Sequence, residues 1–267
     1  MNQTSLTIIH CTEDSLAAHV TEHLLDRTVA ERAEAQWVRD LWDPAVRPAA
    51  RLYVDLAGLP GRSNRPHVKA RRLRFHPRGL SANAAHAYVC FRLASALDIE
   101  GDRLLLLSFD TDGRPIEQRC ARGIIQAAGA VPAPMRVVIA EATPEFDGWV
   151  LAGFIPRNDH EHRLLTSERD ALGRAGYSFD PVRAPHLLTS TIERDARDAK
   201  KVCGRLLQLQ AQAGPEDGRV RDCLDAPLHT LRANGAKAGL EEFIRDVETV
   251  VLPLLEGGSR IRSPQAD

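Results

Sequence analysis

The chain has few aromatic residues, and its cysteines are not arranged in pairs. Phe, Trp and Tyr make up 5% of the 267 residues, which argues against a surface that stacks single-stranded bases on aromatic rings. The five cysteines are odd in number and form no C-x-x-C motif. This usage argues against structural zinc and predicts a reduced, cytoplasmic protein. They are Cys11, Cys90, Cys120, Cys203 and Cys223.

Long apolar runs and an excess of one charge are also missing. No stretch approaches the roughly 20 apolar residues that span a bilayer. Residues 1–5 lack the basic segment that opens a signal peptide. We therefore expect a cytoplasmic protein with no membrane partner. The formal net charge is −1, so any contact with nucleic acid must use a local basic patch.

Several common catalytic and binding motifs do not occur. The sequence contains no G-x-x-x-x-G-K-[ST], no G-x-G-x-x-G and no G-x-S-x-G. P-loop ATP hydrolysis, dinucleotide binding and serine-hydrolase chemistry therefore lack support. The segment from Ile8 to Asp14 resembles the start of a phospho-receiver domain. That family places its phospho-acceptor Asp much nearer to this segment than Asp110 lies, which argues against it.

Apolar runs that alternate with helical patterns predict an α/β fold with a parallel sheet. The runs that predict strands are short, apolar and mostly rich in β-branched residues or leucine. The expected strands are residues 6–11, 51–56, 104–109 and 136–140. The helices expected between them are residues 15–25, 81–97 and about 117–128.

Strand patterns become rare after residue 155, and helical periodicity replaces them. The helices expected there are residues 161–173, 190–213, 219–234 and 240–255. We therefore predict a parallel-sheet domain over residues 1–155, with a long loop at residues 58–79. A mainly helical lobe over residues 156–256 and a flexible tail over residues 257–267 are expected to follow.

Acidic residues follow two of the expected strands, which lie far apart in the sequence. Glu13 comes after the first strand, and Asp110 and Asp112 come after the strand at residues 104–109. Ligands of a parallel sheet bind outside the carboxyl ends of its strands, so we expect these carboxylates to meet there. Mg²⁺ prefers oxygen ligands and would offset their mutual repulsion. The alternative is that residues 110–113 form an ordinary polar turn.

Glu13 and the Asp110-Thr111-Asp112 motif resemble the TOPRIM fold, over roughly residues 5–150. TOPRIM is the metal-binding α/β domain of topoisomerases, bacterial primases and the OLD-type nucleases of phage defence. The resemblance implies that Glu13, Asp110 and Asp112 bind Mg²⁺ or Mn²⁺ and carry the catalysis.

Three further positions bear on the resemblance. Leu24 and Leu25 stand where the family has a pair of leucines. Asp14 stands where the family usually has Gly, and Ala17 where it commonly has an acidic residue. The latter two positions are departures from the family pattern.

The resemblance also extends to the acidic residues after the strand at residues 136–140. TOPRIM-like defence proteins often place another acidic residue here, sometimes just before a Trp. We therefore expect Glu141 to be a fourth metal ligand, and Glu145 or Asp147 to be a fifth. The alternative is a solvated loop from which Trp149 packs into the core.

The loop at residues 58–79 is basic in a chain of almost zero net charge. Between Gly61 and Gly79 it has arginines, a lysine and histidines but no acidic residue. Such a segment can neutralise phosphates, although its arginines could instead pair with surface carboxylates. The expected nucleic-acid contacts are Arg62, Arg65, Lys69, Arg71, Arg72 and Arg74.

These features lead to two hypotheses. The first is a Mg²⁺- or Mn²⁺-dependent nuclease that hydrolyses phosphodiesters of DNA or RNA, in phage defence and with an ATPase as partner. The sequence shows neither a crossover Tyr nor a primase zinc module, which favours nuclease over topoisomerase or primase activity. The second hypothesis is a non-catalytic TOPRIM-like subunit that binds a partner protein, and the departures at Asp14 and Ala17 motivate it.

Overall fold

The computed structural model describes most of the chain. The described residues are 6–12, 14–34, 51–55, 79–112, 119–131, 133, 135–189, 195–209 and 217–257. Of residues 51–55 only the backbone is described. No helix within these ranges is long and apolar enough to cross a membrane.

Four parallel strands form the sheet, in the order β2-β1-β3-β4. Each coincides with an expected strand, because a short apolar run is the pattern of a parallel strand buried on both faces. The predicted mixed α/β fold with a parallel sheet is thereby confirmed. The strands are β1 (Thr7–Thr12), β2 (Arg51–Asp55), β3 (Arg103–Asp110) and β4 (Met135–Ala142).

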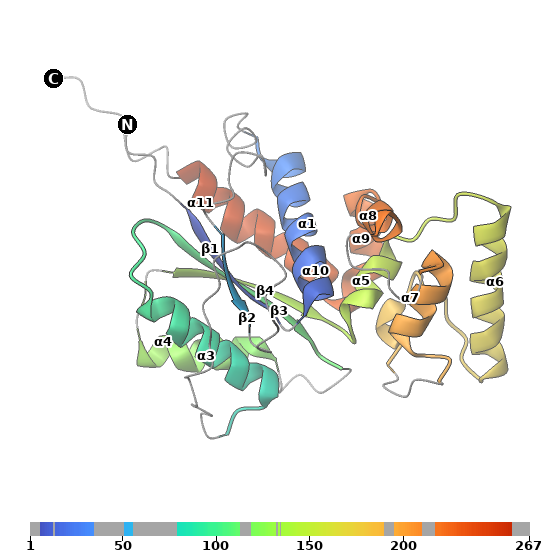
Figure 1. The fold of residues 1–267 in the computed structure, drawn as a ribbon, viewed down its shortest axis with the longest axis horizontal. Helices are drawn as coiled ribbons and strands as arrows, with labels where there is room; N and C mark the ends of the chain where they lie inside the picture. Colours follow the sequence, from blue (N-terminus) through green and yellow to red (C-terminus); the bar gives the residue numbers. More distant parts are fainter. Residues whose placement is uncertain are drawn as a thin grey trace.

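Helices cover both faces of the sheet (Figure 1). α1 (Ser15–Arg32) lies on one face, and α3 (Ala82–Ala96) and α4 (Cys120–Ala130) lie on the other. β1 connects through α1 to β2 at one edge, whereas β3 connects through α4 to β4 at the other edge. The two central strands therefore flank the topological switch point, the usual ligand site of such a sheet.

After β4 the described chain is helical. The α-helices are α5 (Phe146–Ala152), α6 (Asp159–Arg174), α7 (Ala199–Leu207), α8 (Gly218–Leu224), α9 (Leu228–Gly235), α10 (Leu240–Asp246) and α11 (Leu252–Gly257). Short 3₁₀ segments are η3 (Pro185–Leu187) and η4 (Ala236–Ala238), and η5 (Val247–Val251) is a π turn.

Four of these helices differ from the prediction. α7 begins only at Ala199, with Asp198 as its N-cap after a turn, so the helix expected from residue 190 is too long. The helix expected at residues 219–234 is two helices, which break before Pro227 because proline cannot donate a backbone hydrogen bond. α5 was not expected at all.

One continuous hydrophobic core joins the α1 face of the sheet to the helices that follow residue 155. Trp149 on α5 is fully buried in it, packs against Phe146 and Phe243, and donates from Nε1 to the carbonyl of Ala238 at 2.7 Å. Trp149 therefore packs into the core from a helix rather than from a solvated loop. The domain boundary expected near residue 155 crosses this core.

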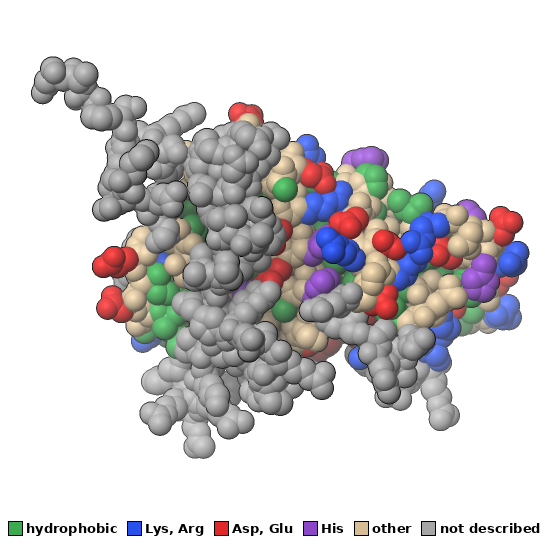
Figure 2. Space-filling model, turned by 45° about the horizontal axis from the view of Figure 1, so that its top comes forward, with side chains coloured by type: hydrophobic (Ala, Val, Ile, Leu, Met, Phe, Trp, Pro, Cys, Tyr) green, Lys and Arg blue, Asp and Glu red, His purple; other side chains and the backbone are tan. Residues whose placement is uncertain are grey.

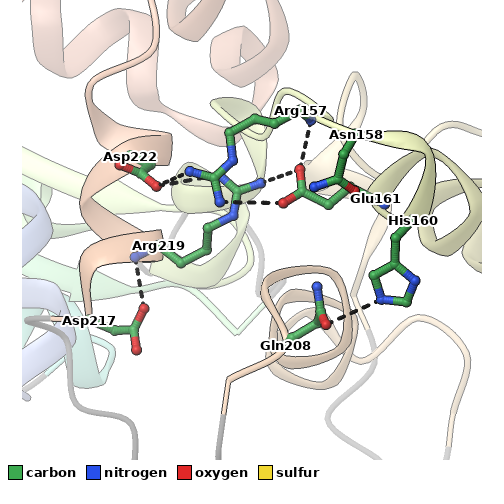
Figure 3. A network of polar contacts seen from close by, with 8 residues as sticks. All are labelled: Arg157, Asn158, His160, Glu161, Gln208, Asp217, Arg219 and Asp222. Atoms are coloured by element: carbon green, nitrogen blue, oxygen red, sulfur yellow. Dashed lines mark hydrogen bonds and ion pairs between the residues drawn. The ribbon is translucent and has the colours of Figure 1, made fainter.

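An ion-pair network centred on the buried Glu161 connects the start of α6 to α8 (Figure 3). The Glu161 carboxylate is 3% exposed and accepts hydrogen bonds from Arg219 at 2.7 Å and from the Arg157 backbone N–H at 2.7 Å. The Arg219 guanidinium also lies over the ring of Phe154, 5.3 Å from its centroid. Elsewhere on the face drawn in Figure 2, basic and acidic side chains are interspersed over the helical part.

The close packing of α3 against α4 depends on a glycine. A Cβ on Gly123 would lie 1.8 Å from the carbonyl oxygen of Ala84. We expect Gly123→Ala to lower the free energy of unfolding by about 3 kcal/mol, because the two helices must separate. Gly129→Ala, at an open position of the same helix, is the control and should raise it by about 0.5 kcal/mol. Urea unfolding measures both; equal effects would contradict the close helix contact.

Candidate functional site

The site lies outside the carboxyl ends of β1 and β3. Asp110 ends β3 and is half-buried. Its Oδ1 accepts a hydrogen bond from the backbone N–H of Phe146 at 3.0 Å, at the start of α5. Its carbonyl accepts a hydrogen bond from Asn83 Nδ2 at 2.8 Å, at the start of α3. Helices from both faces of the sheet therefore hold Asp110 in place.

The two residues after Asp110 continue the pairing with the end of β4 and with the segment that follows it. The N–H of Thr111 donates to the carbonyl of Ala142 at 2.9 Å, and the N–H of Asp112 donates to that of Pro144 at 3.0 Å. Asp112 has a φ of 49°, a left-handed conformation that Asp tolerates better than most residues. The expected Asp-x-Asp motif is thus a fixed extension of the sheet.

At the end of β1, Asp14 begins α1. Its Oδ1 accepts a hydrogen bond from the backbone N–H of Ala17 at 2.7 Å, so Asp14 is the N-cap of the helix. Thr12 pairs with Ser108 on β3, which aligns the two strand ends. The predicted ligand Glu13 lies outside the described residues.

Five of the described carboxylates interact electrostatically here, and we call them the carboxylate cluster: Asp14, Asp110, Asp112, Glu145 and Asp147. Asp198, the N-cap of α7, adjoins the cluster and also raises the pKa of Glu145. Burial raises the pKa of Asp110 to about 9, and the charges of Asp14 and Glu145 add to this increase. Burial and the charge of Asp147 raise the pKa of Glu145 to about 7. Burial raises the pKa of Asp147 to about 6. Ionising all of them at once is therefore unfavourable unless a cation is present.

Lys200 is a basic residue of this site. It lies in the first turn of α7, is exposed, and lowers the pKa values of Glu145 and Asp147 against the effect of burial. Lys200 lies in a segment of mixed charge, a pattern that a solvated helix face explains, so the sequence pattern does not single it out. The signal that points to it is Asp198, the N-cap of α7, which places the first turn of the helix at the cluster.

Glu141 does not join the cluster. Glu141 pairs in register with Phe109, whose side chain packs on the face of the sheet that α3 and α4 cover. Side chains alternate between the two faces along a strand, so the residues next to Glu141 and Phe109 lie on the opposite face. Glu141 accepts a hydrogen bond from the backbone N–H of Cys120 at 2.9 Å, at the start of α4. Burial raises its pKa, although this hydrogen bond partly opposes the increase.

The structure therefore brings together Asp110, Asp112, Glu145 and Asp147 among the residues expected from sequence. In the ranges that it describes, no three His, Cys, Asp or Glu side chains converge as metal ligands. The expected nucleic-acid contacts lie outside the described residues: Arg62, Arg65, Lys69, Arg71, Arg72 and Arg74.

Comparison of the chain with protein-family models, curated proteins and solved structures found no match. The fold and the site define the class: an α/β protein with carboxylates at the switch point of a parallel sheet. What this class of site does must be argued from its chemistry.

Proposed function

We propose that the protein is a divalent-cation-dependent nuclease that hydrolyses phosphodiesters of DNA or RNA at the carboxylate cluster. The observation that carries the proposal is the environment of Asp110. It lies at the switch point of the sheet, and the charges that raise its pKa are those of other acids. A carboxylate in these surroundings is stably ionised only beside a cation.

Mg²⁺ or Mn²⁺ fits these residues. Mg²⁺ usually takes one or two carboxylates and keeps several waters, so it does not need three convergent protein ligands. Asp110 and Asp112 would hold the cation, and the TOPRIM resemblance adds Glu13. When bound, the cation would neutralise phosphate charge and lower the pKa of a bound water.

The remaining residues of the site supply complementary functions. Glu145 and Asp147 are partly accessible at the start of α5, where their carboxylates would accept hydrogen bonds from a water and orient it for attack. Lys200 places a positive charge beside the negative charge that develops on the phosphate. The basic segment at residues 58–79 would hold the substrate backbone in a salt-dependent way. The resemblance further suggests phage defence with an ATPase partner.

The second candidate is a non-catalytic subunit that binds a partner protein. Two observations favour it. Asp14, at a family Gly position, is used as a helix cap, and no three described side chains converge as metal ligands. In this case the carboxylate cluster would be a remnant of the fold.

A cleavage assay separates the two candidates. Purified protein is incubated with Mg²⁺ or Mn²⁺ and plasmid DNA or RNA, beside an Asp110→Asn/Asp112→Asn variant. Asn is chosen because it tolerates the left-handed backbone of residue 112. We expect the variant to lose at least about 100-fold in rate, whereas Asp170→Asn on the exposed face of α6 is unchanged. Inactivity with every metal and substrate, together with a stable partner complex, would support the subunit.

A further inference from the structure

A chain of buried polar side chains lies between α1 and the two central strands. His10 on β1 is 1% exposed, and its Nε2 lies 2.6 Å from the hydroxyl of Ser108 on β3. That hydroxyl donates to Thr21 on α1 at 3.0 Å. The other ring nitrogen of His10 lies 3.1 Å from a carboxylate oxygen of Glu22, also on α1. Ser108 and Thr21 are fully buried.

These polar residues replace an apolar pattern. The same face of the strands begins with Ile8 on β1 and with Leu104 and Leu106 on β3, all packed in the core. It becomes polar at His10 and Ser108, and the next residue on this face of β3 is Asp110, which ends the strand. Buried polar groups cost free energy unless they are hydrogen-bonded, and apolar residues of similar size often stabilise a core as well or better. Stability alone therefore does not explain the change.

We propose that the His10–Ser108–Thr21 chain positions the carboxylate cluster for divalent-cation binding. The inference rests on the proposed function and adds positioning residues to it. Apolar packing is non-directional and lets a helix slide by fractions of an ångström, whereas hydrogen bonds at 2.6 Å and 3.0 Å define one placement. The helix placed in this way is α1, whose N-cap is Asp14.

Two substitutions of Thr21 separate an effect on stability from an effect on positioning. Thr21→Val keeps the volume and removes the hydroxyl; Thr21→Ser keeps the hydroxyl and removes a methyl group from the core. By calorimetric titration of Mn²⁺, we expect Thr21→Val to bind about tenfold more weakly, in the range found for outer-shell substitutions. Thr21→Ser should bind within about twofold of wild type although its melting temperature is lower. Ser108→Ala should weaken binding at least as much as Thr21→Val.

Thr28→Val is the matched control. Thr28 is fully buried on the same helix, seven residues further along, and its hydroxyl has no hydrogen-bond partner among the described residues. Its substitution should raise the melting temperature slightly and leave Mn²⁺ affinity unchanged. Equal affinity of Thr21→Val and wild type, or an equal loss in Thr21→Ser, would overturn the inference.

The wild type and Asp110→Asn separate this inference from the proposed function. If wild type binds Mn²⁺, Asp110→Asn does not and Thr21→Val binds normally, the positioning role is wrong and the metal site stands. If wild type itself binds no Mn²⁺ at any concentration tested, the proposed function fails, and the inference fails with it.

Discussion

Replacing Asp110 by Asn is expected to stabilise the metal-free protein while it abolishes Mn²⁺ binding. Burial and the surrounding acids raise the pKa of Asp110 to about 9, so its ionised form is unfavourable in the fold. Asn removes the charge, and its side-chain oxygen can still accept the hydrogen bond from the Phe146 backbone. A residue that lowers stability in the absence of its ligand is typical of a functional site.

The gain in stability should depend on pH in a defined direction. The pKa of Asp110 in the fold lies above its ordinary value of about 3.9. Its favourable contribution is therefore complete below about pH 4 and is lost as the pH rises towards about 9. Asn does not titrate. The stabilisation by Asp110→Asn should be near zero at about pH 4 and at least about 2 kcal/mol at about pH 8, a value reduced because Asp110 is partly exposed.

Thermal unfolding in a chelator and in excess Mn²⁺ measures both effects. Mn²⁺ at about 100 times its dissociation constant should stabilise wild type by about 2.7 kcal/mol and the variant not at all. Asp170→Asn on α6 is the control and should differ from wild type by less than about 0.5 kcal/mol throughout. If Asp110→Asn is less stable than wild type at about pH 8 without metal, other groups already stabilise the ionised Asp110, and the prediction is wrong.

Replacing Glu161 by Ala is expected to lower the free energy of unfolding by about 3 kcal/mol or more. The carboxylate is 3% exposed and lies between two arginines (Figure 3), of which Arg219 has a side chain only 12% exposed. Removal leaves a buried guanidinium with the longer contact to Asp222, at 3.6 Å. Breaking a buried pair on one side costs more than the pair contributes, because the remaining charge is desolvated.

The pH dependence at Glu161 has the opposite sign to that at Asp110. Burial is the largest influence and raises the pKa of Glu161, but the Arg157 N–H and the two guanidiniums together lower it below its ordinary value. The contribution of Glu161 is therefore present above about pH 4.3 and is lost as the pH falls through the lowered pKa. The difference in the free energy of unfolding between wild type and Glu161→Ala should therefore become smaller at acidic pH.

Urea unfolding between about pH 3 and pH 7 tests this prediction. Glu242→Ala is the control, because Glu242 and Arg245 form an ion pair at 3.8 Å in which both side chains are more than half exposed. Such pairs contribute less than about 0.5 kcal/mol. If Glu161→Ala and Glu242→Ala lower the free energy of unfolding equally, the ion pairs of Glu161 are as exposed to solvent as a surface pair, and the prediction is wrong.

Part of the site could be read from sequence because local patterns determine it. β3 ends at Asp110, and Asp112 follows two residues later, wherever the sheet lies in the fold. A parallel sheet exposes its ligand site at that edge. The placement of Asp110 beside the acids of α5 is consistent with the expected convergence there. Lys200 could not be found in this way, since it reaches the site only because α7 packs against α5.

Glu141 shows the limit of the same reasoning. Its position at the end of β4 is a property of the sequence, but the face on which it lies depends on the pleat of β4 and on which helix covers that face. α4 covers it, and the backbone N–H of Cys120 at the start of that helix donates a hydrogen bond to the Glu141 carboxylate. A strand-end acid can therefore serve a ligand or a helix, and only the packing decides which.

By itself, the sequence determined the four parallel strands, the helices that alternate with them and the acids at the strand ends. These features depend on interactions within a few residues: apolar runs, capping side chains and turn-forming residues. The tertiary structure alone decided that the helices after residue 155 share the core of the sheet, that α5 brings Glu145 and Asp147 to Asp110, and that His10 meets Ser108. The reason is physical: contacts between residues far apart in the chain depend on which faces pack together, and no local pattern specifies that choice.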